Sequence, residues 1–155
     1  MTTSAIQRFL ARHRKIGMDT SIFIYQVEGH RKYLELTRAT FAWLESPSGR
    51  AVTSTITMLE LLVQPYRLSD FHRVNELYLL LSRYPNLDWV EPGLGIADRA
   101  ARLRAEHRLG VADAVQAATA LASEATGFVS NDKTFKRVTR LDVLVLDDAL
   151  ICNQE

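Results

Sequence analysis

The chain has 155 residues with a formal net charge of +1, and 47% of its residues are hydrophobic and 24% charged. This length suits one domain, and the composition excludes disordered, collagen-like and low-complexity chains. Because 19 Lys and Arg residues face 18 Asp and Glu residues, a protein that holds nucleic acid by bulk charge is excluded too, and any such affinity must be local. We expect residues 1–155 to form a single domain.

The number of cysteines and the length of the apolar runs indicate the compartment of the protein. Cys152 is the only cysteine, so the chain has neither a disulfide framework nor a cysteine zinc site. No apolar run approaches the ~18 residues that a membrane span needs. We therefore expect a protein of the reducing cytoplasm that has no membrane partner.

The chain opens with an Arg-rich, acid-free segment, and residues 1–14 are predicted to form an amphipathic helical extension. A surface helix laid against the domain needs this pattern, and so does an organellar transit peptide. The two faces of the segment consist of Ile6, Phe9, Leu10 and His13 on one side, and Arg8, Arg12 and Lys15 on the other.

Beyond the extension, short β-branched or apolar runs alternate with segments of helical periodicity. This alternation is typical of a parallel sheet covered by helices, so the predicted fold is α/β, with about five parallel strands in a three-layer α/β/α arrangement. We expect strands near residues 15–19, 51–54, 87–91, 127–130 and 142–146.

The intervening segments each carry an apolar face at helical spacing. We expect these faces to cover the sheet. They consist of Tyr33, Leu36, Trp43 and Leu44; of Phe71, Val74, Leu77, Tyr78 and Leu81; and of Ile96, Ala100, Leu103 and His107.

Acidic residues follow nearly every predicted strand. In open α/β sheets the ligand site lies outside the carboxyl ends of the strands, so we expect these acids to meet there. Four carboxylates without matching bases repel one another, and a bound hard cation relieves that repulsion. The candidate ligands are Asp19 after the first strand, Glu60 beyond the second, Asp113 at the start of a helix, and Asp132 after the fourth. Glu91, Asp147 and Asp148 follow the remaining strands.

Each of these four acids also has an ordinary structural explanation. Asp19 and Asp132 suit helix caps or turns, Glu60 can close a capping box with Thr57, and Asp113 suits the dipole of a helix start. These explanations do not account for all four lying at strand exits or adjoining helix starts. That coincidence favours a shared site.

Other site chemistries lack their patterns. The four histidines show no metal-binding spacing, and no phosphate-loop motif is present. Gly93 and Gly95 open a helix after a strand, but Asp98 stands where a dinucleotide fingerprint requires its third glycine. The carboxylate site is the chemistry that remains.

Four segments in this order and spacing resemble the PIN domain nucleases, and among them the toxins of VapBC-type toxin-antitoxin pairs. The resemblance covers roughly residues 15–150, and Ser130 stands where many relatives have Thr. The segments are Gly-Met-Asp-Thr-Ser at 17–21, Ser-Thr-Ile-Thr-Met-Leu-Glu at 54–60, Val-Ala-Asp-Ala-Val-Gln-Ala-Ala-Thr-Ala-Leu at 111–121, and Val-Ser-Asn-Asp-Lys-Thr-Phe at 129–135.

The resemblance implies a Mg²⁺- or Mn²⁺-dependent endoribonuclease that acts on structured RNA such as tRNA. It also implies a homodimer inhibited by a small antitoxin, and the apolar side chains of Phe41, Trp43, Phe71 and Tyr78 supply surface for a dimer. The four acids are then both the metal ligands and the catalytic residues. These four residues are Asp19, Glu60, Asp113 and Asp132.

Residues beside the acids complete the predicted site. Ser130 and Thr20 are candidates to orient a carboxylate or a metal-bound water. A basic run after Asp132 supplies candidate phosphate contacts, although a solvated basic helix has the same pattern. This run consists of Lys133, Lys136, Arg137 and Arg140. The alternative function is a non-catalytic module of the same fold whose acidic pocket captures a basic peptide or a structural ion.

Overall fold

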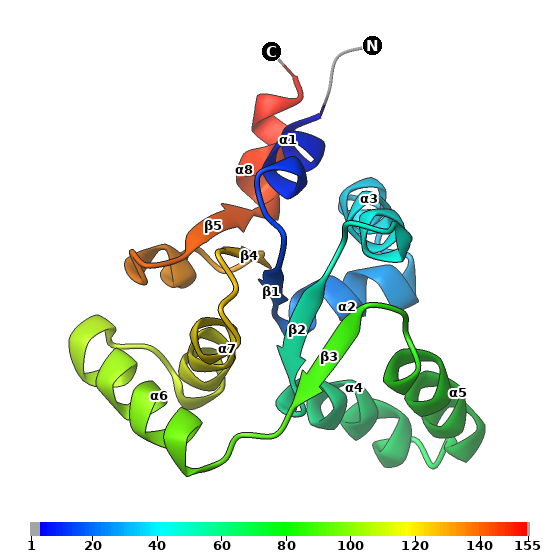
Figure 1. Cartoon of the computed structure of the whole chain (residues 1–155). Helices are drawn as coiled ribbons and strands as arrows, with labels where there is room; N and C mark the ends of the chain where they lie inside the picture. Colours follow the sequence, from blue (N-terminus) through cyan, green and yellow to red (C-terminus); the bar gives the residue numbers. More distant parts are fainter. Residues whose placement is uncertain (1–3, 155) are drawn as a thin grey trace.

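A computed structural model describes residues 4–154 of the chain. Its five strands pair in parallel in the order β3-β2-β1-β4-β5 (Figure 1). The predicted α/β fold with a five-stranded parallel sheet is therefore confirmed. The strands are β1 (Ile16–Met18), β2 (Ala51–Ser54), β3 (Leu87–Val90), β4 (Gly127–Ser130) and β5 (Asp142–Val145).

Helices cover both faces of this sheet, as the predicted three layers require. One buried apolar cluster contains residues of α1 to α5 and α8, and the other contains residues of α6, α7 and the 3₁₀ helix η1. Among residues 4–154, no helix combines the length and hydropathy needed to cross a membrane. The elements are α1 (Ala5–Ala11), α2 (Thr20–Glu28), α3 (Leu34–Glu45), α4 (Ile56–Arg67), α5 (Phe71–Ser82), α6 (Leu94–His107), α7 (Val111–Ala122), η1 (Lys133–Arg137) and α8 (Leu146–Cys152).

Small residues let α7 lie close to the central strands. Ala114, Ala117 and Ala118 of α7 are fully buried. A Cβ built on Gly17 of β1 would lie 2.7 Å from the Ala120 methyl group and 2.5 Å from the Phe128 ring. The glycine therefore permits the close approach that brings the first turn of α7 to the end of β1.

The predicted apolar face of α5 is partly wrong. Val74, Leu77 and Leu81 are buried, but Phe71 is 61% exposed and Tyr78 is 52% exposed. The helix lies at the margin of the fold beside α4, so one side of its apolar face packs into the core while Phe71 and Tyr78 remain exposed. Phe41, in contrast, is buried against Phe23 and is unavailable for the dimer contact expected of it.

Helix α1 packs against α3 and α8, with Ile6, Phe9 and Leu10 buried. This is the surface-helix interpretation of the opening segment. Residues 1–3 of the predicted extension lie outside the described residues.

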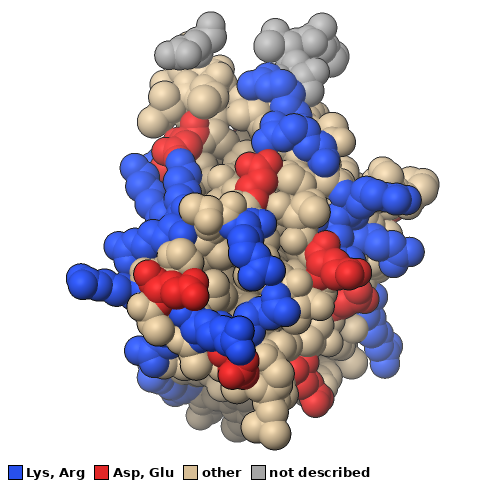
Figure 2. All heavy atoms as spheres, turned by 60° about the vertical axis from the view of Figure 1, so that its left-hand side comes forward, with Lys and Arg blue, Asp and Glu red and all other residues tan. Residues whose placement is uncertain are grey.

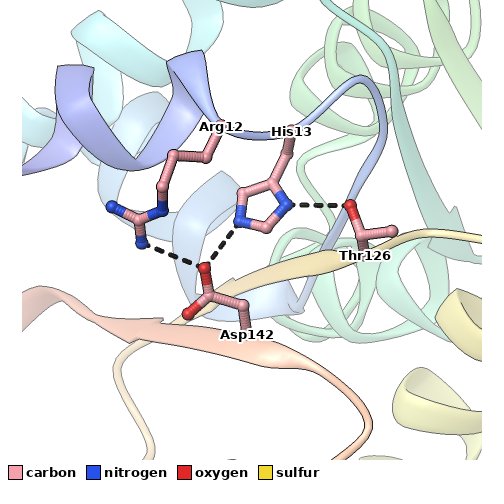
Figure 3. A network of polar contacts seen from close by, with 4 residues as sticks. All are labelled: Arg12, His13, Thr126 and Asp142. Atoms are coloured by element: carbon pink, nitrogen blue, oxygen red, sulfur yellow. Dashed lines mark hydrogen bonds and ion pairs between the residues drawn. The ribbon is translucent and has the colours of Figure 1, made fainter.

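A polar network fastens the end of this N-terminal segment to the sheet (Figure 3). The His13 ring lies 2.8 Å from the Thr126 hydroxyl through Nδ1 and 2.7 Å from Asp142 Oδ2 through Nε2. Arg12 donates to the same carboxylate oxygen at 3.0 Å. Asp142 is thus the shared acceptor of two residues that are far from it in sequence.

We predict that Asp142→Asn weakens this network and lowers the free energy of unfolding by about 1 kcal/mol. Hydrogen bonds to charged groups contribute more, but the half-exposed carboxylate is screened by solvent. Partial burial raises the Asp142 pKa, but the hydrogen bonds from Arg12 and His13 outweigh it and hold this pKa below its usual range. The contribution is therefore present above the unfolded-state pKa and is lost as pH falls through the folded-state pKa.

Urea denaturation at neutral and acid pH measures this effect. Asp98→Asn is the matched control, because Asp98 makes only an exposed helix pair with Arg102. Equal stability of Asp142→Asn and wild type at neutral pH would show that the network does not stabilise the fold.

Candidate functional site

A cavity of about 620 Å³ opens at the carboxyl ends of the central strands β1 and β4. All four predicted acids line it, together with Thr20 and Lys133. The parallel sheet explains this meeting. Asp19 directly follows β1, Asp132 follows the adjacent β4, Glu60 lies on the helix after β2, and Asp113 lies in the first turn of α7.

Asp19 is the most deeply placed of these acids, with only 7% of the residue exposed. One carboxylate oxygen accepts hydrogen bonds from the Ser21 amide at 3.0 Å and the Ser21 hydroxyl at 2.5 Å. The other accepts from the Ser130 hydroxyl at 2.5 Å. Asp19 thus caps α2 and also lines the cavity. Its predicted roles as a helix cap and as a member of the acidic site are therefore compatible.

Burial raises the pKa of Asp19 to about 6, even though hydrogen bonds from Ser130 and Ser21 lower it. The negative charge of Asp113 raises this pKa further. The pKa of Asp113 is also raised, first by burial and then by the charges of Asp132 and Glu60. Asp113 is therefore repelled by Asp132 and Glu60, and it repels Asp19. The four carboxylates of the cavity are electrostatically coupled through Asp113.

Glu60 and Asp132 are exposed at the cavity. Asp132 accepts hydrogen bonds from the amide and hydroxyl of Thr134 and caps η1, as one of its ordinary explanations predicted. The capping box of Thr57 and Glu60 is absent, because the N-cap of α4 is Thr55. The Thr57 hydroxyl instead contacts Thr53 at 2.7 Å.

The two predicted orienting hydroxyls have different partners. Ser130 donates to Asp19 and accepts the Asp132 amide at 3.0 Å, so it links two of the acids. Thr20 lines the cavity, but its hydroxyl donates to Thr57 at 3.3 Å and contacts no acid.

Ser21 and Gln116 line the cavity but were not among the predicted residues. Ser21 donates twice to Asp19, and its position two residues after an aspartate was the available signal. Gln116 lies one turn after Asp113 in an alanine-rich helix, is 3% exposed, and donates to Thr57 at 2.7 Å. The corresponding signal was a single glutamine in an alanine-rich helix, because a buried amide needs hydrogen-bond partners and so indicates a polar contact there.

Among the predicted phosphate contacts, only Lys133 lines the cavity. Lys136 pairs with Asp148 at 2.5 Å, and Arg137 donates to the carbonyl of His107 at 3.2 Å. Arg140 lines a separate hollow beside α6. The first residue of the basic run therefore lies at the cavity, and the other three lie outside it.

The remaining acids after strands lie outside the cavity. Glu91 follows the edge strand β3, and the pair 147–148 follows the edge strand β5, so neither reaches the centre of the sheet. Asp147 accepts from the Tyr33 hydroxyl at 2.7 Å and pairs with Lys32 at 2.9 Å. It is engaged in holding the start of α8.

Carboxylate oxygens are the ligands that Mg²⁺ and Mn²⁺ prefer, so the donor set suits a hard divalent cation. Within residues 4–154, however, no three His, Cys, Asp or Glu side chains are grouped so as to hold one metal ion. Glu60 and Asp132 are the two exposed acids, and the Asp132 carboxylate is held by the amide and hydroxyl of Thr134. The chemistry of the residues therefore fits a cation, whereas their side chains do not converge to ligating positions.

Comparison with protein-family models identifies a family for this chain. The model of the PIN domain matches residues 16–141. No significant match is found among curated protein sequences.

Solved structures of toxin-antitoxin proteins share the fold. A toxin-antitoxin complex from Klebsiella pneumoniae has 25% identity and a TM-score of 0.64, covering 85% of this chain and 97% of that one. VapBC-1 from nontypeable Haemophilus influenzae has 22% identity and a TM-score of 0.65, with coverages of 86% and 98%. VapC20 from Mycobacterium tuberculosis, a sarcin-ricin loop cleaving toxin, has 16% identity and a TM-score of 0.64, with coverages of 83% and 98%.

Proposed function

The chain belongs to the PIN domain family, and from that premise we propose that it is a metal-dependent endoribonuclease, the toxin of a type II toxin-antitoxin pair. The observation that carries this proposal is the acidic cavity, where four carboxylates from separate elements meet. A non-catalytic module that binds a basic peptide or structural ion is the alternative. Burial raises the pKa values of Asp19 and Asp113, and neighbouring carboxylate charges raise them further, so a bound positive charge would stabilise the site in either function.

Asp19, Glu60, Asp113 and Asp132 would hold Mg²⁺ or Mn²⁺. A bound cation of this kind polarises a phosphate and lowers the pKa of a bound water. Ser130 and Ser21 orient the Asp19 carboxylate by donating to both of its oxygens. Lys133, at the cavity, supplies a cation for the phosphate of the RNA. In this scheme the reaction is hydrolysis of an RNA phosphodiester bond.

Cleavage of RNA by the purified protein tests the proposal. We expect hydrolysis of tRNA to stop in chelator and to return when Mn²⁺ or Mg²⁺ is added in excess. Activity that persists in chelator contradicts the metal site, and RNA that stays intact with both metals favours the binding module.

A cognate antitoxin and a second copy of the chain are the proposed partners, and the cytoplasm is the proposed compartment. The structurally similar proteins include toxin-antitoxin complexes. Helices α4 and α5 also expose large apolar side chains, which a partner can cover. These side chains are Leu59, Tyr66, Phe71, Tyr78, Leu79 and Leu80. Light scattering of the isolated chain and of the chain with its antitoxin tests both contacts.

A further inference from the structure

A second hollow, of about 380 Å³, lies beside α6 and carries three arginines. Figure 2 shows Lys and Arg side chains spread over the face that carries α6 and η1, with fewer Asp and Glu side chains among them. The net charge of +1 hides this local excess. The charged residues lining the hollow are Arg99, Arg102 and Arg140, with Asp98 and Glu106.

The guanidinium groups of this hollow are poorly satisfied by the protein. Arg99 is half-buried, yet its side chain donates to no acceptor within residues 4–154, and the same holds for the exposed Arg140. Arg102 pairs with Asp98 at 3.4 Å, but both side chains are about 70% exposed, so the pair contributes little. The guanidinium groups of Arg99 and Arg140 are therefore available to a bound anion.

The hollow is connected to the acidic cavity by a short basic element. Helix η1 begins at Lys133, which lines the cavity, and Arg140 lies seven residues further on. Seven residues span at most about 25 Å. Arg137 donates to the carbonyls of His107 and Arg108 and so fastens the end of η1 to the end of α6. One folded RNA can therefore reach both places.

Resting on the proposed function, we infer that the hollow formed by Arg99, Arg102 and Arg140 binds a backbone phosphate of the RNA substrate at a distance from the bond that is cut. The planar guanidinium fork matches two phosphate oxygens at once. Contacts of this kind position a nucleic acid without reading its sequence. The basic path to the cavity favours RNA over an acidic protein as the occupant.

Binding of RNA in chelator, where cleavage is not required, tests this inference. The variant is Arg99→Ala with Arg140→Ala, and the probes are bulk tRNA and a six-nucleotide RNA, each followed by fluorescence anisotropy. We expect the Kd for tRNA to rise about tenfold and the slope of log Kd against log salt to fall by about 1, because one phosphate contact is lost. The Kd for the short RNA is expected to rise less than the Kd for tRNA, because fewer of its phosphates can reach the hollow.

Two controls separate phosphate binding from other effects. Arg38→Ala with Arg83→Ala removes the same charge from exposed positions on the opposite layer of helices, and should leave tRNA binding unchanged. Arg99→Lys with Arg140→Lys keeps the charge but loses the fork, and should fall between wild type and the alanine variant. Thermal melts show that each variant is folded.

The inference is overturned if the alanine variant binds tRNA as wild type does, if the control pair weakens binding equally, or if wild type does not bind tRNA. It is also overturned if light scattering shows that the alanine variant changes oligomeric state, because the hollow is then a contact between copies. RNA that binds as expected but is never cut with Mn²⁺ contradicts the proposed function alone.

Discussion

Asp113→Asn is expected to reduce metal-dependent RNA cleavage by at least about a hundredfold while leaving the protein folded. Residues that only orient a metal ligand already contribute 10- to 100-fold, and Asp113 is proposed as a ligand itself. The side chain accepts no hydrogen bond from residues 4–154 and lies in the first turn of α7, so the neutral amide replaces it without emptying the core. Initial rates on tRNA in excess Mn²⁺ measure the loss.

A matched control for this experiment changes an aspartate to asparagine away from both proposed RNA-binding places. Because Asp98 lines the arginine hollow, the activity control is instead Asp88→Asn, which removes one negative charge from an exposed position on the edge strand β3, outside both the cavity and the hollow, and is expected to retain wild-type turnover. Wild-type turnover by Asp113→Asn, with the same fold and melting temperature in Mn²⁺, would remove the acidic cavity from the reaction.

Thermal melts are expected to show that the acidic cavity destabilises the metal-free fold near neutral pH and that Mn²⁺ relieves it. A ligand at a hundredfold excess over its Kd stabilises by about 2.7 kcal/mol. For a chain of this size that corresponds to a rise in Tm of roughly 5 to 10 °C. Burial is the main cause of the raised Asp19 pKa, and the charge of Asp113 adds to it. Asp113→Asn removes this repulsion, so it is expected to raise the Tm in chelator and to lose much of the Mn²⁺ response.

The dependence of this effect on pH follows from the Asp19 pKa. Burial raises this pKa from 3.8 to about 6, so the folded state binds more protons than the unfolded state between these two values. Protonated Asp19 therefore contributes stability that is fully present below about pH 4 and is lost as pH rises through about 6, a difference of about 3 kcal/mol. The Tm in chelator should fall across this window for wild type and much less for Asp19→Asn.

Opposite results have a clear meaning. If the wild-type Tm does not respond to Mn²⁺ and Asp113→Asn is less stable than wild type in chelator, the acids act as separate caps and helix-dipole partners. The four carboxylates then do not form a metal site, whatever activity the protein has.

The sequence by itself determined the sheet and the edge on which the acids lie. Apolar runs and helical periodicity are local signals, so the predicted strands agree with the observed ones to within one residue at each end. Parallel strands place their carboxyl ends on one edge, so Asp19 and Asp132 had to emerge side by side once β1 and β4 were neighbours. The alanines of α7 are likewise visible in the sequence, and their small side chains suit close packing against the sheet.

Only the tertiary structure decided the partners of individual side chains. Thr57 bonds to Thr53 and Gln116 and leaves Glu60 free of a capping box, because β2, α4 and α7 meet there. Arg137 donates to the carbonyl of His107 at the end of α6. The basic residues that follow one another in the sequence therefore have different partners in the structure. These contacts join residues that are distant in the chain, and packing in three dimensions, which periodicity does not encode, selects among the possible partners.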